Sequence, residues 1–216
     1  MELNKYIEHT LLKQDAKKEE LIKIFDEAIE NKFFGVCINP CNVAFAGEYL
    51  KDTDIKIVTV IGFPLGQNTT EIKILETIDA VKNGADEIDM VMNVGKLKDW
   101  EYDYIVDEIS KIKFASQGRT LKVILETDLL TQEEIKKACE LCIQAKADIV
   151  KTSTGFVKNG VGAKAEDVKL MYETVKDFGL GVKASGGIRD KEAALKMIEA
   201  GATRLGTSSG VKIVNS

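Results

Sequence analysis

Two lysines in this chain each stand at the end of an apolar run, where an amine could react with a carbonyl. Lys151 follows the run 147–150 and Lys183 follows 180–182, and small or hydroxyl-bearing residues come directly after both. Lysine is seldom fully buried unless it is paired, and burial disfavours its charged form. A neutral amine is a nucleophile that can form a Schiff base. The two lysines therefore indicate carbonyl chemistry, and the loops after them indicate a phosphorylated substrate.

An acid, Asp89, is predicted to lie near Lys151. Three similar turns each end a helix and begin a strand, at 84–86, 146–148 and 201–203. Asp89, Lys151 and Gly206 each stand three residues beyond one of these turns. If the turns are equivalent, the three positions have equal depth on strands four, six and eight, and alternate strands of a barrel fill the same interior layer. Lys183, on strand seven, would occupy a neighbouring layer within reach of a long side chain.

Each of these residues also has an ordinary structural interpretation. Lys151 could be a solvated group at a strand end, Asp89 a hydrogen-bonded core acid, and Lys183 a surface residue. An unpaired buried charge is costly. Because the residues around all three look buried, we expect the three charges to share one environment.

Short apolar runs rich in β-branched residues alternate with helical patterns along the chain. Continuous apolar runs are typical of strands that are buried on both faces of a parallel sheet. The predicted strands cover residues 6–11, 35–38, 55–61, 86–92, 121–126, 147–152, 180–184 and 203–207. Eight alternations predict an α/β fold, a single-domain TIM (β/α)8 barrel that spans residues 1–216. The alternative is an open doubly wound sheet, which the same pattern permits.

Helices are predicted from apolar spacing and from capping residues. The predicted buried faces are Leu21, Ile24, Phe25, Ala28 and Ile29; Ile74, Leu75, Ile78 and Val81; and Ile135, Ala138, Cys139, Cys142 and Ile143. Helix starts are predicted at Asn68 with Glu71, at Thr131 with Glu134 in a capping box, and at Asp190.

Two clusters of glycine and serine follow the last two predicted strands, at 185–187 and 206–210. TIM barrels often bind phosphate in the loops after strands seven and eight, through backbone N–H groups at a short helix. Ordinary turn chemistry is the alternative for either cluster alone. The pair of clusters favours a phosphate site.

Composition excludes several classes of protein. The net charge of −5 argues against nonspecific nucleic-acid binding, which basic patches drive. No stretch approaches the roughly 20 apolar residues of a membrane span, and the first residues contain no apolar signal region. We expect a cytoplasmic protein with four reduced cysteines.

No metal site is expected. Cys139 and Cys142 form a Cys-x-x-Cys pair on the apolar face of a predicted helix, where core packing is the favoured interpretation. Cys37 and Cys41 have no histidine partners, because His9 is the only histidine. A multi-histidine site or a histidine-based triad is therefore excluded, and nothing positive indicates carboxylate-bound Mg²⁺.

Several motifs resemble those of one enzyme family. The runs at 87–91, 151–155 and 182–187 look like those of the deoxyribose-phosphate aldolases, and the runs at 7–12, 36–40, 61–66 and 205–209 fit the same family in order. The resemblance implies a TIM-barrel class I aldolase without a metal or cofactor. It would cleave 2-deoxy-D-ribose 5-phosphate reversibly to acetaldehyde and D-glyceraldehyde 3-phosphate in deoxynucleoside catabolism. A homodimer or higher homo-oligomer is expected from the family.

The resemblance also implies residue roles. Lys151 would be the Schiff-base lysine, Lys183 the lysine beside it and Asp89 the acid of the proton relay. Five residues match positions around the phosphate: Gly155, Gly186, Gly187, Ser208 and Ser209. Some members end in a tyrosine that assists proton transfer, whereas this sequence ends in 214–216, so it either exchanges protons differently or lacks that tail.

Two other functions remain open at this point. Paired lysines also occur in other Schiff-base phosphosugar enzymes of similar barrel design, such as a transaldolase. A catalytically silent barrel that senses a phosphosugar is a different class, which the joint presence of Lys151, Lys183 and Asp89 disfavours.

Overall fold

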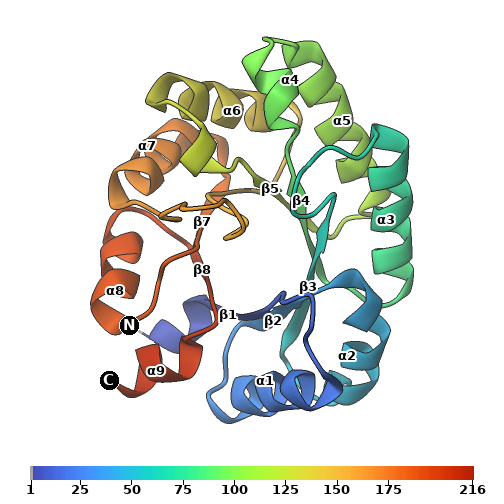
Figure 1. Ribbon diagram of the computed structural model, residues 1–216, viewed down its shortest axis with the longest axis vertical. Helices are drawn as coiled ribbons and strands as arrows, with labels where there is room; N and C mark the ends of the chain where they lie inside the picture. Colours follow the sequence, from blue (N-terminus) through green and yellow to red (C-terminus); the bar gives the residue numbers. More distant parts are fainter. Residues whose placement is uncertain (1) are drawn as a thin grey trace.

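Eight parallel strands close into a barrel in the computed structural model, which describes residues 2–216 (Figure 1). The strands are β1 (Ile7–Leu11), β2 (Gly35–Ile38), β3 (Lys56–Ile61), β4 (Glu87–Val91), β5 (Thr120–Ile124), β6 (Ile149–Lys151), β7 (Gly181–Ser185) and β8 (Arg204–Thr207). All eight predicted strands are confirmed. The first and last strands pair, with Ile7 opposite Leu205, so the TIM barrel is confirmed and the open doubly wound sheet is wrong.

Helices surround the barrel, as Figure 1 shows. The α-helices are α1 (Lys18–Glu30), α2 (Val43–Leu50), α3 (Thr70–Lys82), α4 (Val94–Lys98), α5 (Tyr102–Ala115), α6 (Gln132–Gln144), α7 (Ala165–Val175), α8 (Lys191–Glu199) and α9 (Gly210–Asn215). The 3₁₀ helices are η1 (Leu3–Tyr6), η2 (Pro40–Asn42), η3 (Thr127–Leu129) and η4 (Lys176–Phe178). No helix among residues 2–216 is long and apolar enough to cross a membrane.

Local capping signals place two of the three predicted helix starts correctly. Thr131 and Glu134 form the expected capping box at α6, and the Asp190 carboxylate accepts the Ala193 N–H at the start of α8 (2.9 Å). The predicted start of α3 is wrong. Thr69 is the capping residue there, because its hydroxyl accepts the Ile72 N–H, whereas the Asn68 side chain donates to Glu76.

The predicted buried faces of α1 and α6 are largely confirmed, and that of α3 is confirmed only in part. Ile29 on α1 is exposed, and Ile143 on α6 is half-buried. Cys139 and Cys142 are buried in the core, and burial raises the pKa of both thiols. On α3, by contrast, Leu75 is 60% exposed and Ile78 is 43% exposed. Val81 is buried and Ile74 is half-buried, so only part of the predicted face packs against the core.

A buried ion pair explains the orientation of α3. The Lys73 ammonium, on the inner face of α3, donates to Glu108 on α5 (2.9 Å) and to the backbone carbonyl of Val91 (3.0 Å). Neither charged side chain is exposed. Burial lowers the pKa of Lys73 and raises that of Glu108, and their mutual attraction opposes both shifts. Gly62 leaves room for the lysine, because a Cβ there would lie 2.8 Å from Lys73 Cε.

The ion pair gives a stability prediction. We expect Glu108→Leu to lower the free energy of unfolding by about 3–5 kcal/mol, because Lys73 would keep a buried charge without its partner. Urea unfolding measures the change. Replacing both residues, as Lys73→Met with Glu108→Leu, should restore most of the loss, since an apolar pair needs no desolvation of charge. Glu71→Leu on the exposed side of α3 is the control. Equal stabilities of Glu108→Leu and this control would contradict the prediction.

Candidate active site

A cavity of about 740 Å³ opens at the carboxyl ends of the strands. Loops at this end carry the site residues of TIM-barrel enzymes. The cavity is lined by residues 10–15, 151, 153–156, 185–189 and 206–208, which follow or end β1, β6, β7 and β8. Of the two lysines singled out from the sequence, Lys151 reaches the cavity wall itself.

Lys151 ends β6 and is almost completely buried, with 3% of its surface exposed at the cavity. Its ammonium nitrogen donates to Asp89 Oδ2 on β4 (2.7 Å). The structure therefore brings together the acid and the lysine that the three similar turns predicted. The interpretation of Lys151 as a solvated group at a strand end is wrong.

Lys183 lies beside Lys151, since the two residues are register partners on β6 and β7. Its ammonium donates to the same Asp89 Oδ2 (2.7 Å) and to Glu8 on β1. Burial lowers the pKa of Lys183, but the Asp89 and Glu8 carboxylates outweigh burial and hold that pKa well above its usual range. Gly206 on β8 provides the space, because a Cβ there would lie 3.0 Å from Lys183 Cε. Lys183 is therefore a buried cation and not a surface residue.

Sequence reasoning missed the third lysine of this network, Lys122 on β5. Its ammonium lies 3.0 Å from Asp89 Oδ1, 2.5 Å from Glu87 Oε2 and 3.5 Å from Glu8 Oε1. Burial lowers the pKa of Lys122, and Asp89 and Glu8 raise it above its ordinary value. The signal was present in the sequence, because Lys122 interrupts the apolar run of its strand just as Lys183 does.

The Asp89 carboxylate is the centre of this network. Burial raises its pKa, but the positive charges of Lys122, Lys151 and Lys183 hold the pKa well below its usual range. Asp89 is therefore ionised in the free protein. Glu8, which sequence reasoning also missed, is completely buried beside the lysines.

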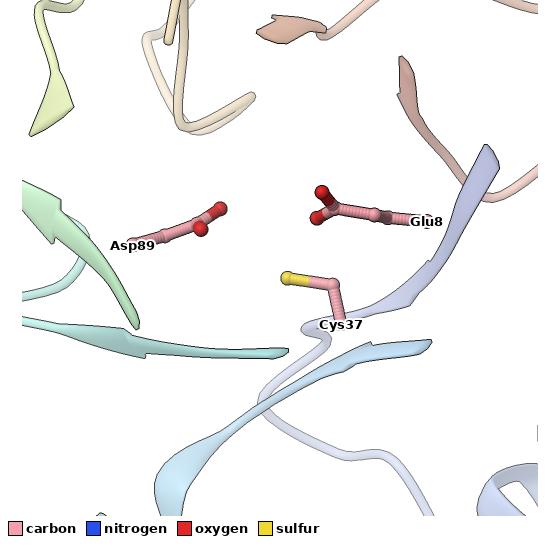
Figure 2. A group of neighbouring side chains, drawn as sticks. All are labelled: Glu8, Cys37 and Asp89. Atoms are coloured by element: carbon pink, nitrogen blue, oxygen red, sulfur yellow. The ribbon is translucent and has the colours of Figure 1, made fainter. Parts of the chain in front are cut away.

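Glu8, Cys37 and Asp89 also form the one group of potential metal ligands found among residues 2–216. Figure 2 shows the two carboxylates and the thiol converging inside the barrel from β1, β2 and β4. Both carboxylates already bind lysine ammonium groups. Burial raises the pKa of the Cys37 thiol, so the thiolate that a metal requires is disfavoured. The group fits an internal charge network better than a metal centre.

Four of the five residues assigned to phosphate line the cavity: Gly155, Gly186, Gly187 and Ser208. The three glycines have positive φ angles, of 82°, 86° and 76° respectively. The fifth residue, Ser209, is outside the cavity lining, and its N–H donates to Thr207 Oγ1 (2.9 Å). Two cationic residues that sequence reasoning missed, Lys13 and Arg189, also line the cavity. They could attract an anionic substrate group.

The protein is a TIM barrel with a buried lysine at the cavity wall, and a second lysine and a shared carboxylate lie beside that lysine. These are the groups that a Schiff-base aldolase needs. A family model described as DeoC/LacD family aldolase matches residues 4–215, and the chain belongs to that family.

Similar proteins support the assignment of the chain to this aldolase family. A deoxyribose-phosphate aldolase of Enterococcus faecalis is 58% identical over 216 residues, which cover 100% of this chain and 97% of the relative. A deoxyribose-phosphate aldolase of Clostridium tetani is 53% identical over 215 residues, with coverage of 99% and 98%. The solved deoxyribose phosphate aldolase of Aeropyrum pernix, described as a unique tetramer, superposes with a TM-score of 0.91 at 34% identity, covering 99% of this chain and 90% of that one. The protein is an aldolase, a lyase.

The charge network gives an activity prediction. We expect Lys183→Leu to reduce kcat by about 100-fold or more, because it removes a buried positive charge that favours the neutral form of the neighbouring Lys151 amine. Lys183→Arg should be a poor substitute, because guanidinium keeps the charge but is larger than the space that Gly206 leaves. Steady-state cleavage kinetics measure both effects, and Lys169→Leu on the exposed face of α7 is the control. An unchanged kcat in Lys183→Leu would contradict the role of this lysine.

Proposed function

We propose that the protein is a class I aldolase that reversibly cleaves 2-deoxy-D-ribose 5-phosphate to acetaldehyde and D-glyceraldehyde 3-phosphate. The observation that carries this proposal is the Lys151–Asp89 contact at the wall of a glycine-lined cavity. The names of relatives with 53–58% identity support the choice of substrate. We place the reaction in cytoplasmic deoxynucleoside catabolism, and we treat residues 1–216 as one functional domain.

The proposed reaction begins at Lys151. Its neutral amine attacks the aldehyde carbon of the open-chain sugar and forms a carbinolamine, which loses water to give an iminium ion. Asp89, acting through water, accepts the proton that Lys151 loses and returns it to the departing hydroxyl, while Lys183 stays protonated beside the reacting nitrogen. The iminium then accepts the electron pair as the bond between the second and third carbons breaks. Asp89 takes up the proton of the C3 hydroxyl through the same water, and D-glyceraldehyde 3-phosphate leaves.

An enamine of acetaldehyde remains on Lys151 after cleavage. Protonation at its terminal carbon regenerates an iminium ion, and hydrolysis by one water molecule releases acetaldehyde and the free lysine. Atoms balance, since the water lost in dehydration is returned in hydrolysis. No redox step or metal is involved.

The Asp89 carboxylate favours the iminium. Its Oδ2 atom lies 2.7 Å from the Lys151 nitrogen, and the carboxylate is completely buried. The iminium places a positive charge beside this oxygen. Preorganised charge of this kind stabilises a cationic intermediate without reorganisation during the reaction.

The phosphate group is proposed to bind at the glycine-lined wall, with Gly155, Gly186, Gly187 and Ser208 around it. Ser209 is retained as a candidate through its backbone, although it lies outside the cavity lining. Binding energy from a phosphate remote from the breaking bond can position the sugar for reaction.

Covalent trapping tests the function directly. We expect sodium borohydride with acetaldehyde to attach a two-carbon adduct to Lys151, because only an imine is reduced to a stable secondary amine. Peptide mass spectrometry locates the adduct, and Lys151→Ala should abolish it. A coupled assay in EDTA should show cleavage of deoxyribose 5-phosphate. Activity with fructose 6-phosphate in the coupled assay would instead identify a transaldolase. Absence of any borohydride adduct would favour the phosphosugar sensor.

We further propose that the chain forms a homodimer or a higher homo-oligomer. The outward apolar face of α3, with Leu75 and Ile78, continues to Phe114 on α5, which is 89% exposed. Residues of both helices line a hollow of about 750 Å³. The two helices lie side by side in Figure 1. A second copy related by a two-fold axis could place its own Phe114 in this hollow, because such interfaces are self-complementary.

The assembly proposal predicts a mass change in solution. We expect Leu75→Glu with Phe114→Glu to lower the molecular mass measured by sedimentation equilibrium, because each buried carboxylate would oppose association. Phe178→Glu, on η4 with a similarly exposed side chain, should leave the mass unaltered. A monomeric unaltered protein at micromolar concentration would contradict the proposal.

A further inference from the structure

Glu126 has an unusual backbone conformation directly after β5. Its φ and ψ angles are 61° and 63°, in the left-handed region, which costs a residue with a side chain roughly 1–3 kcal/mol. The residue is only 4% exposed. Strain of this kind persists where the surrounding structure enforces it, and it is found most often near functional sites.

Both oxygens of the Glu126 carboxylate are committed to one residue, Thr154. The Thr154 N–H donates to Oε1 (3.1 Å) and the Thr154 hydroxyl donates to Oε2. The same hydroxyl accepts the N–H of Phe156 (3.1 Å). Burial raises the pKa of Glu126, and the two hydrogen bonds from Thr154 only partly oppose that shift. A single carboxylate therefore fixes the turn at 154–156.

This turn lies between the reacting lysine and the glycine-lined wall. Thr154 stands three residues after Lys151, and 154–156 line the cavity. Gly155, with a φ of 82°, provides little conformational restraint of its own. The segment after β5 also holds the residues just before the turn, because Leu125 N–H donates to the Lys151 carbonyl (2.9 Å) and Thr127 N–H to the Thr152 carbonyl (3.0 Å).

A second acid from the same segment holds the far end of this loop. Asp128 Oδ2 accepts the Gly162 N–H (2.7 Å). Gly162 packs against the backbone of Gly186, where an added Cβ would lie 2.5 Å from the carbonyl carbon. The Ala163 N–H donates to the Gly186 carbonyl (3.1 Å). The loop after β6 is therefore fastened at both ends, and Glu126 fastens the end next to Lys151.

We infer that Glu126 is a positioning residue, which holds the turn at 154–156 so that the phosphate end of the substrate is aligned with Lys151. It acts through Thr154 and does not touch the substrate. The inference rests on the proposed function, because it assigns the phosphate to this wall of the cavity. A displacement of about 1 Å in such a positioning element can reduce the rate about 100-fold.

The test compares a phosphorylated substrate with one that has no phosphate. We expect Glu126→Gln to reduce kcat/KM for deoxyribose 5-phosphate roughly ten- to 100-fold, mainly through KM, because the amide cannot accept both hydrogen bonds. Borohydride trapping of acetaldehyde on Lys151 should remain within about three-fold of the unaltered protein, because that two-carbon aldehyde does not reach the phosphate wall. Glu133→Gln, exposed on α6, is the matched control.

A double-mutant cycle with Thr154→Val tests whether Glu126 acts through Thr154. If it does, the double variant should lose clearly less than the product of the two single losses, because the second change removes a contact already broken. If Glu126→Gln does not fold, as judged by circular dichroism, Glu126→Asp replaces it, since the shorter carboxylate cannot reach both donors.

Three results would overturn the inference: an unchanged kcat/KM in the Glu126 variant, an equal loss of acetaldehyde trapping, or strictly multiplicative effects with Thr154→Val. Failure of the proposed function would look different, because the unaltered protein would then not cleave deoxyribose 5-phosphate at all.

Discussion

The Asp89 carboxylate shared by three buried lysines is the interaction on which the site depends. Each of its oxygens lies within 3.0 Å of an ammonium group, and no part of the carboxylate is exposed. Charges as deeply buried as these are costly unless they are paired. Their mutual attraction fixes the ends of Lys122, Lys151 and Lys183, three long side chains that would otherwise be flexible. Lys151 therefore lies in a preorganised electrostatic field.

The barrel makes this arrangement possible. Its strands bring side chains from distant parts of the sequence into one dry interior, including Glu8 from β1 and Lys183 from β7. Glycine is required where a lysine needs space, at Gly206 beside Lys183 and at Gly62 beside Lys73. The helices outside the barrel contain a similar buried ion pair. Lys73 and Glu108 join α3 to α5, and an apolar face of α3 stays exposed.

Many features were predictable because they depend on near neighbours in the chain. Apolar runs located all eight strands, the Thr131 and Glu134 capping box located α6, and lysines ending apolar runs located Lys151 and Lys183. The face of α3 was predicted only in part, because its period suggested burial of Leu75 and Ile78, which are exposed. The buried ion pair of Lys73 and Glu108 outweighed the apolar spacing, and Glu108 lies 35 residues from Lys73 in the sequence.

By itself, the sequence determined the order of the elements, the alternation that leads to a TIM barrel, and the family to which the motifs belong. Only the tertiary structure decided which charges meet. Strand tilt and register bring Lys122 and Glu8 to Asp89, and the left-handed turn at Glu126 directs its carboxylate to Thr154. These contacts join residues 28–94 positions apart, or more for the contacts of Glu8 with Lys122 and Lys183. Local periodicity and capping carry no information on such separations, because those contacts form only when the barrel closes.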